Sequence, residues 1–381
     1  MFNLREHFLL DPSITFLNHG SFGATPKPVF DEYQRWQREL ENQPVEFLGR
    51  RCAGLMADSR AVLGEYLGTH ADNLVYTQNV TISLNIIARS LELGADDEVL
   101  TSDHEYGATD RMWRFLSRER GFTFTTRPVD LSSREACIES FWQAVTPRTR
   151  IIFLSHITSP TAIILPVEEI LRRARTQGII TIIDGAHVAG QLSLHLDSLG
   201  ADFYGGNLHK WLCAPKGAGF FYARPEMQRL VKPLVVSWGY ESETPSASAF
   251  VDHHEWWGTR DVASFLSVPA AIRFQSDNDW DRVRVECHQL AKDAQTRICD
   301  LTGSPPLHSQ ADHWFRQMTA APLPQDTDLV ALKTRLYDEY RVEVPLAAWN
   351  GKKLIRVSIQ GYNTSQDVDV LLDALSSLLR R

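Results

Sequence analysis

Short apolar runs alternate with amphipathic stretches through the middle of the chain. Between about residues 73 and 222, seven runs rich in β-branched and aromatic residues have the length of strands. They lie at Leu74–Thr77, Glu98–Thr101, Phe122–Arg127, Arg150–Ser155, Ile179–Asp184, Ala201–Gly205 and Gly219–Tyr222. Helical patterns separate several of them, at Ile82–Leu93, Ala108–Arg120 and Val167–Gln177. The alternation predicts an α/β domain around a mostly parallel seven-stranded sheet, with strands buried on both faces.

The two ends of the chain follow a different pattern. A loop with several glycines, LNHGSFGATPKP, precedes a helical run at Val29–Leu40. After about residue 261 the pattern is first helical and then mixed. The predicted helices are Ala263–Ser276, Trp280–Leu301 and Ser365–Leu379, and the predicted strands are Trp314–Thr319, Glu343–Leu346 and Leu354–Ile359. We predict three units: an N-terminal segment (residues 1–30), a large domain (31–260) and a smaller α+β domain (261–381).

Composition and charge exclude several classes of function. The 381 residues carry a net charge of −8, so a basic surface that binds nucleic acid is not expected. No apolar run approaches the ~18 residues of a membrane-spanning helix. The five cysteines are scattered without any C-x-x-C spacing, which argues against disulfides or a zinc site and favours a reducing cytoplasm.

One further cluster of polar residues, His253, His254 and Glu255, could suggest a metal site. It lacks the H-E-x-x-H spacing, and neighbouring residues on a strand point to opposite faces. We therefore expect a surface pair of histidines and no metal ligands.

The segment between residues 179 and 222 carries the most informative chemistry. Asp184 and His187 follow one apolar run, and His209 and Lys210 follow the next. Taken singly, such an aspartate usually caps a turn, and such a lysine usually lies in solvent. Ligands of open α/β sheets bind at the carboxyl ends of the strands, where these four residues converge. A pyridoxal phosphate enzyme needs a lysine for the Schiff base and a carboxylate for the pyridine nitrogen. Lys216 is the other nearby lysine that could form the Schiff base.

Several motifs carry a resemblance to a known family. The segment D-G-A-H is followed by N-L-H-K-W, and the chain also contains LNHGSFGATPKPVF, SDHEYGA, RTRIIFLSHITSPTAIILP and VSWGY. Together they resemble the aminotransferase class V family of pyridoxal phosphate enzymes, and within it the isopenicillin N epimerase-like subgroup. The resemblance covers nearly the whole chain. It implies a fold-type I architecture and pyridoxal 5'-phosphate as cofactor.

The resemblance implies roles around the cofactor ring. Lys210 forms the Schiff base, and Asp184 pairs with the pyridine nitrogen. His187 lies near the ring oxygen. His104, in SDHEYGA, stacks on the ring face; by itself it is equally an ordinary loop histidine.

A second set of residues is implied for the phosphate. Val80 and Thr81 begin a helical pattern, and a helix N-terminus favours a dianion; a plain helix cap is compatible with this role. His209 also reaches the phosphate. Thr259, in W-W-G-T-R-D, corresponds to the family segment that reaches the cofactor phosphate bound in the partner subunit. The alternative is that this segment is a simple surface turn. The resemblance thus implies a homodimer with shared active sites.

Four residues are candidates for binding a small amino-acid substrate. Arg356 resembles the arginine that holds the substrate carboxylate through two parallel donors, although a salt bridge within a strand explains it as well. Asn18 and His19, in the N-H-G-S-F-G loop, and Tyr106 line the substrate mouth.

The resemblance favours an isomerase that inverts the α-carbon of an amino acid. Lys210 is the expected base. His104 stacks on one face of the ring, and Tyr106 or His19 is the candidate that returns a proton on the face opposite Lys210. A C–S lyase, an aminotransferase and a catalytically idle cofactor-binding protein remain alternatives. A cysteine desulfurase is disfavoured, because Cys287 and Cys299 lie in helical patterns without a glycine-rich loop.

Overall fold

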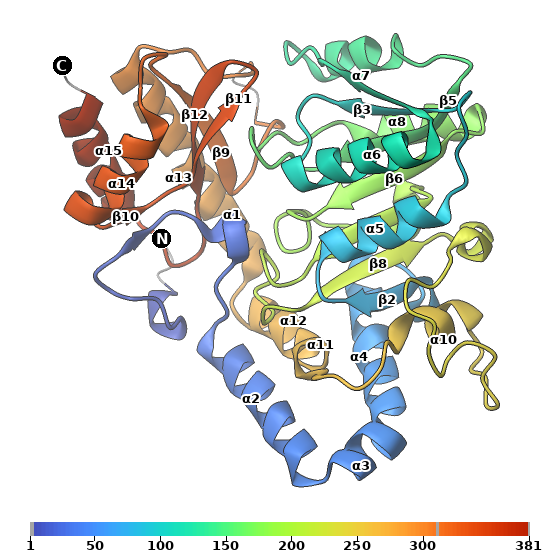
Figure 1. Ribbon diagram of the computed structural model, residues 1–381. Helices are drawn as coiled ribbons and strands as arrows, with labels where there is room; N and C mark the ends of the chain where they lie inside the picture. Colours follow the sequence, from blue (N-terminus) through green and yellow to red (C-terminus); the bar gives the residue numbers. More distant parts are fainter. Residues whose placement is uncertain (1–3, 310–311, 380–381) are drawn as a thin grey trace.

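A seven-stranded sheet forms the centre of the larger part of the molecule (Figure 1). The computed structural model describes residues 4–309 and 312–379. The strand order is β2-β8-β7-β6-β5-β3-β4. The strands are β2 (Leu74–Thr77), β3 (Glu98–Ser102), β4 (Thr123–Arg127), β5 (Thr149–Ser155), β6 (Ile180–Gly185), β7 (Phe203–Asn207) and β8 (Gly219–Ala223). β8 is antiparallel to both of its neighbours, and the other adjacent pairs are parallel. The predicted mostly parallel sheet is confirmed.

Apolar side chains cover both faces of this sheet. In β5, Ile151 and Phe153 belong to one buried cluster, whereas Ile152 and Leu154 belong to the other. Successive strand residues point to opposite faces, which explains the division. One cluster includes residues of α5 (Val80–Ser90) and α6 (Gly107–Arg120), which lie in front of the sheet in Figure 1, and the other includes α8 (Val167–Thr176). The sheet is therefore the middle layer of three.

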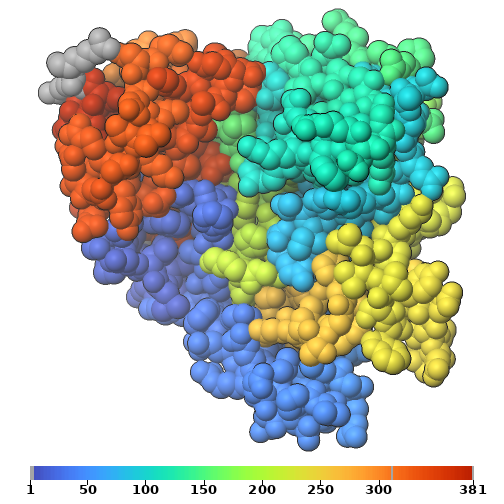
Figure 2. Space-filling view, in the orientation of Figure 1, coloured from blue at the N-terminus to red at the C-terminus, as the bar shows by residue number. Residues whose placement is uncertain are grey.

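A smaller antiparallel sheet lies in the C-terminal part, with the order β11-β12-β9. Its strands are β9 (Met318–Leu323), β11 (Leu346–Trp349) and β12 (Lys352–Ser358), and its helices are α13 (Trp280–Thr302), α14 (Leu329–Tyr340) and α15 (Ser365–Leu379). The N-terminal segment packs here: β1 (Thr15–Phe16) runs parallel to β10 (Val342–Glu343). Figure 2 shows this dark blue segment against the orange C-terminal part. The predicted domain boundaries stay a prediction.

Other helices connect and surround the two sheets. They are α1 (His19–Phe22), α2 (Lys27–Asn42), α3 (Pro44–Glu46), α4 (Cys52–Leu67), α7 (Arg134–Trp142), α9 (Leu196–Leu199), α10 (Ala249–Glu255), α11 (Ala263–Leu266) and α12 (Val268–Asp277). The hydrophobic pattern did not reveal α4 or α7. No helix in the described part of the chain is both long and apolar enough to cross a bilayer.

Prolines account for two differences from the predicted elements. The helix expected at 263–276 is two helices, because Pro269 lies in the first turn of α12, where a proline is tolerated, and cannot continue the preceding helix. Likewise, the strand expected at 343–346 is divided between β10 and β11, with Pro345 between them. A third strand begins at Met318 instead of Trp314, because Met318 pairs with Ser358. Trp314 is fully buried outside the strand.

The expectation for the paired histidines is wrong. His253 and His254 lie on the helix α10 and not on a strand. His254 is 1 % exposed, and its ring packs edge-on against Phe221 and at a tilt against Phe250. It is therefore a core residue and not part of a surface pair.

Candidate active site

A cavity of about 150 Å³ lies at the carboxyl ends of β5, β6 and β7, beside the N-terminus of α5. This is the edge at which ligands bind to open α/β sheets. Seven of the residues predicted for the site line it: Val80, Thr81, Tyr106, Asp184, His187, His209 and Lys210. The fold thus brings together residues that are far apart in the sequence.

Lys210 follows β7 and is largely buried at this cavity. Its Nζ lies 3.2 Å from Nε2 of His187. Burial lowers the pKa of Lys210 to about 7; the charge of Arg356 adds to this effect and that of Asp184 opposes it. At neutral pH a large fraction of the amine is therefore unprotonated, which is the form that attacks an aldehyde.

Asp184 lies near the end of β6 and is 2 % exposed. Its Oδ1 accepts a hydrogen bond of 2.9 Å from the Ala186 amide. Burial raises the pKa of this carboxyl group, while the amide and the charge of Lys210 favour the carboxylate. A protonated pyridine nitrogen would provide the missing counter-charge for a buried carboxylate.

Glu105 is a second acid close to Asp184 that sequence reasoning missed. Its Oε2 accepts hydrogen bonds from the Ser155 amide (2.8 Å) and hydroxyl (2.6 Å), and its Oε1 accepts from the Ser102 hydroxyl (2.6 Å). Burial raises the pKa of Glu105 to about 7, and the charge of Asp184 acts in the same direction. Its position between His104 and Tyr106 in SDHEYGA was the available signal.

Only one of the two aromatic candidates in SDHEYGA faces the cavity. His104 is 1 % exposed and does not line it. Its Nδ1 lies 2.7 Å from the Thr161 hydroxyl, and its ring centroid is 4.4 Å from that of Trp349. Tyr106 lines the cavity and is 45 % exposed. The predicted stacking of His104 on the cofactor ring and the predicted substrate role of Tyr106 both stay predictions.

The N-terminus of α5 forms one end of the cavity. The Val80 amide donates to Oδ1 of Asn207 (2.9 Å), and the Ile82 amide donates to the capping Asn79 side chain (3.1 Å). Thr81 lines the cavity between them. This arrangement suits a phosphate group, which helix amides and the helix dipole attract. Asn207 also lines the cavity and was not among the predicted residues.

His209 also lines the cavity. Its Nδ1 is 3.1 Å from the Ala218 carbonyl oxygen and donates to it, because that oxygen can only accept. Burial lowers the pKa of His209 to about 4. Its role toward a phosphate stays a prediction.

Arg356 reaches the cavity wall from β12. Its Nη1 donates to the backbone oxygen of Ser159 (2.6 Å) and to its hydroxyl (3.1 Å), and its Nη2 donates to the Ser21 hydroxyl (3.1 Å). Both serines line the cavity. Burial lowers the pKa of Arg356 to about 10, so the guanidinium stays charged at neutral pH. Its predicted role as a carboxylate ligand is compatible with this position and stays a prediction.

Asn18 and His19 are placed differently from what the sequence suggested. Both are buried, and neither lines the cavity, whereas Ser21 and Phe22 of the same loop do. Nε2 of His19 lies 3.0 Å from the backbone oxygen of Lys210 and donates to it. His19 thus holds the backbone of Lys210, and a substrate role for either residue stays a prediction.

Thr259 lies outside this cavity. It is exposed and follows Gly258, whose φ of +106° is in the left-handed region. Its predicted contact with the phosphate of a partner subunit stays a prediction.

None of the five cysteines lines the cavity, and all are free thiols. Cys299 is partly exposed, and the other four are buried. Burial raises the pKa of Cys299 to about 11 and that of Cys213 to about 12. These thiols stay protonated at neutral pH, which makes them poor nucleophiles.

The residues of the cavity fit pyridoxal phosphate. Lys210 provides a poorly protonated amine, Asp184 a buried carboxylate and α5 an anion-binding N-terminus. His187 adds an imidazole 3.2 Å from the amine. This is the set of groups that the aldehyde, the pyridine nitrogen, the ring oxygen and the phosphate require.

Comparisons with known proteins agree with this chemistry. The family model described as aminotransferase class-V matches residues 16–371. The chain is 36% identical to isopenicillin N epimerase of Amycolatopsis lactamdurans, over 99% of this chain and 98% of that one. It is 26% identical to a probable chloroplastic L-cysteine desulfhydrase of Arabidopsis thaliana, over 97% and 84% of the two chains.

The fold has a solved counterpart. A C-DES variant with glycine covalently linked to its PLP cofactor superposes with a TM-score of 0.84 at 21% identity, covering 98% of this chain and 99% of that one. The predicted fold-type I architecture is confirmed. Because the family match spans most of the chain and the cavity has the required groups, this chain belongs to the aminotransferase class-V family and is an enzyme that uses pyridoxal 5'-phosphate.

Proposed function

We propose that this enzyme inverts the α-carbon of an amino acid or of an amino-acid unit in a larger substrate. The observation that carries the proposal is the 36% identity over 99% of the chain to an isopenicillin N epimerase. Identity to the cysteine desulfhydrase is 26%. Isopenicillin N itself is the first substrate to test.

The proposal assigns the first proton transfer to Lys210. Bound pyridoxal phosphate withdraws electrons from the α-carbon and so weakens its C–H bond. Lys210 takes this proton as the free amine, a role that its pKa of about 7 supports. Asp184 holds the cofactor's ring nitrogen, and Arg356 holds the substrate carboxylate beside Ser21 and Ser159.

Inversion also needs a second group that returns a proton on the opposite face. We assign this role to Tyr106, whose exposed side chain lines the cavity. His19 was the other candidate, but it lies outside the cavity wall and donates to the backbone of Lys210. His104 is likewise turned toward Thr161 and Trp349.

Reaction in deuterated water tests the proposal. Single-enantiomer isopenicillin N and a panel of L-amino acids are incubated with the enzyme, and products are separated by chiral chromatography and mass spectrometry. We expect the opposite enantiomer with one deuterium at the α-carbon. Release of pyruvate without any inverted product would contradict the proposal.

The variant Tyr106→Phe separates the two proton transfers. We expect it to exchange the α-proton for deuterium with retained configuration, while formation of the other enantiomer falls by about 10²-fold. Tyr337→Phe, on the remote helix α14, is the matched control. Equal inversion rates for Tyr106→Phe and wild type would remove Tyr106 from this role.

A C–S lyase is the second candidate, favoured by the desulfhydrase relative. Elimination from a cysteine conjugate needs the same lysine base and no protein thiol. It predicts pyruvate, ammonia and a thiol from S-substituted cysteines, and a coupled lactate dehydrogenase assay detects the pyruvate.

We also propose that two copies of the chain form a homodimer with shared active sites. The exposed Thr259, outside the cavity of its own chain, supports this arrangement. Light scattering coupled to gel filtration measures the mass, and a monomer at micromolar concentration would contradict the proposal.

A further inference from the structure

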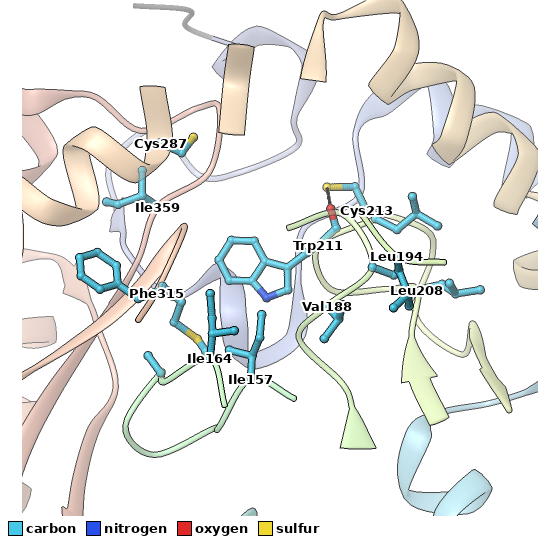
Figure 3. Packing of buried hydrophobic residues seen from close by; sticks show 14 of the residues in the cluster. Ile157, Ile164, Val188, Leu194, Leu208, Trp211, Cys213, Cys287, Phe315 and Ile359 are labelled. Atoms are coloured by element: carbon cyan, nitrogen blue, oxygen red, sulfur yellow. Dashed lines mark hydrogen bonds between the residues drawn. The ribbon is translucent and has the colours of Figure 1, made fainter. Parts of the chain in front are cut away.

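Trp211 directly follows the cavity lysine, Lys210, in the sequence and is fully buried. Figure 3 shows its indole ring at the centre of the apolar core, with Ile157 and Ile164 on one side and Val188 nearby. The ring of His19 packs against it with a centroid distance of 5.0 Å. The indole is therefore held in one orientation by close packing.

The indole nitrogen makes one polar contact, and that contact is to the active site. Nε1 of Trp211 donates to Nδ1 of His187 over 3.2 Å. An indole N–H can only donate, so Nδ1 of His187 must carry a lone pair and no proton. The neutral imidazole then has its proton on Nε2.

Nε2 of His187 is the atom that lies 3.2 Å from Nζ of Lys210. The N–H of His187 is thus directed at the lysine nitrogen, which must accept it as an unprotonated amine. The pKa of His187 is lowered well below its usual value, first by burial and then by surrounding cations. A charged imidazole would also direct a second N–H at the indole N–H, which disfavours that form.

We propose that Trp211 is a positioning residue that sets the tautomer of His187, so that the Nε2–H is a permanent donor toward the cofactor. The inference rests on the cofactor site proposed at Lys210. The aldehyde that bonds to a lysine is adjacent to the hydroxyl oxygen on the pyridoxal ring. A donor beside Lys210 Nζ is therefore placed to donate to that oxygen in its anionic form.

This role has a measurable consequence for pH dependence. A fixed donor stabilises the deprotonated ring oxygen and so lowers the pH midpoint at which the visible absorbance of the loaded enzyme changes. Removing the indole N–H frees His187 to move its proton to Nδ1, so the donor is lost and the midpoint rises. The titratable groups around His187 and Lys210 are Arg356, His209, His19 and Asp184, with Glu105 beyond Asp184.

The variant Trp211→Phe tests the inference by spectrophotometric pH titration of the holoenzyme. We expect the absorbance midpoint to rise by about one pH unit, the scale expected for one hydrogen bond to a charged group. Trp280→Phe is the matched control. Trp280 is 4 % exposed in the same core, and its Nε1 donates to the Gly190 backbone oxygen instead (3.1 Å). The absorbance midpoint of the Trp280→Phe variant should stay at the wild-type value.

A double substitution separates positioning from packing. In a His187→Gln background the side-chain amide has no tautomer to set, so adding Trp211→Phe should leave the midpoint unchanged. An unchanged midpoint for Trp211→Phe alone would overturn the inference. So would an equal shift in the His187 and His187→Gln backgrounds, because loss of packing alone would then explain it.

A second measurement needs no Trp211 variant. ¹⁵N NMR of the wild-type holoenzyme, with the His187 signals assigned from His187→Gln, should show a proton on Nε2 and none on Nδ1. A proton on Nδ1 would overturn the inference. The absorbance midpoint and the ¹⁵N signals do not depend on turnover. If the proposed inversion reaction is wrong, the enzyme shows no α-deuteration, and this outcome is distinct from a failure of the inference about Trp211.

Discussion

Nη1 of Arg356 donates to the backbone oxygen of Ser159 over 2.6 Å, which joins the smaller sheet to the wall of the active-site cavity. Arg356 lies on β12, and Ser159 follows β5 of the large sheet. Its second nitrogen, Nη2, donates to Ser21 of the N-terminal segment. One guanidinium therefore connects three parts of the chain at the place where a substrate would bind.

We expect Arg356→Lys to bind substrate poorly while retaining the charge. A lysine ammonium cannot present two parallel donors to a carboxylate, so KM should rise by roughly 10- to 100-fold with a smaller change in kcat. Arg335→Lys, at an exposed pair with Glu339 on α14, is the control. Steady-state kinetics with an unaltered KM for Arg356→Lys would exclude a carboxylate-binding role.

Replacing Lys210 by alanine should remove both the covalent link and the base. We expect turnover to fall by about 10²- to 10⁴-fold or more, the usual contribution of a positioned base. Borohydride treatment followed by mass spectrometry should attach the cofactor to wild type but not to Lys210→Ala. Lys216→Ala, at a different cavity, should behave as wild type. Covalent attachment to Lys210→Ala would assign the cofactor to another lysine.

Glu105 should make folding stability depend on pH. Its pKa is about 7 in the folded protein, against 4.5 for an unperturbed glutamate. Between these values the folded state holds a proton that the unfolded chain releases, so stability falls as the pH rises from about 4.5 to about 7.

Glu105→Gln should remove this pH-dependent loss of stability, because the glutamine amide does not titrate. The amide can still accept hydrogen bonds from Ser155 and donate one to Ser102. Relative to wild type, the variant should gain about 3 kcal/mol in the free energy of unfolding between pH 4.5 and pH 8. Urea denaturation at several pH values measures it, with Glu65→Gln on the surface of α4 as control. A constant difference between wild type and Glu105→Gln across this range would refute the raised pKa.

Thiol modification should leave catalysis intact. Cys299, the partly exposed cysteine, has its pKa raised to about 11 by burial, so only about one molecule in a thousand has the thiolate at pH 8. We expect slow alkylation by iodoacetamide and full activity afterwards, and also full activity for Cys299→Ser. Rapid inactivation that Cys299→Ser prevents would point to a thiol-dependent sulfur transfer.

The hydrophobic pattern was sufficient for the central sheet, because strands buried on both faces have continuous apolar runs. The same runs located Asp184 and Lys210, since Asp184 lies at the end of one strand and Lys210 follows the neighbouring one, and the carboxyl ends of these strands share one edge. Proline positions were the weak point. Pro269 and Pro345 interrupt elements that the pattern joined, although each proline was visible in the sequence.

What the sequence determined by itself was therefore the layer architecture and the placement of Asp184 and Lys210 at one edge of the sheet. The tertiary structure decided which neighbours of those residues take part. It placed Tyr106 in the cavity lining and His104 against Thr161 and Trp349, and it brought Glu105 close to Asp184. It also placed the indole of Trp211 against His187. The physical reason is that backbone periodicity locates regular strands and helices, whereas side-chain directions in turns depend on packing between distant segments.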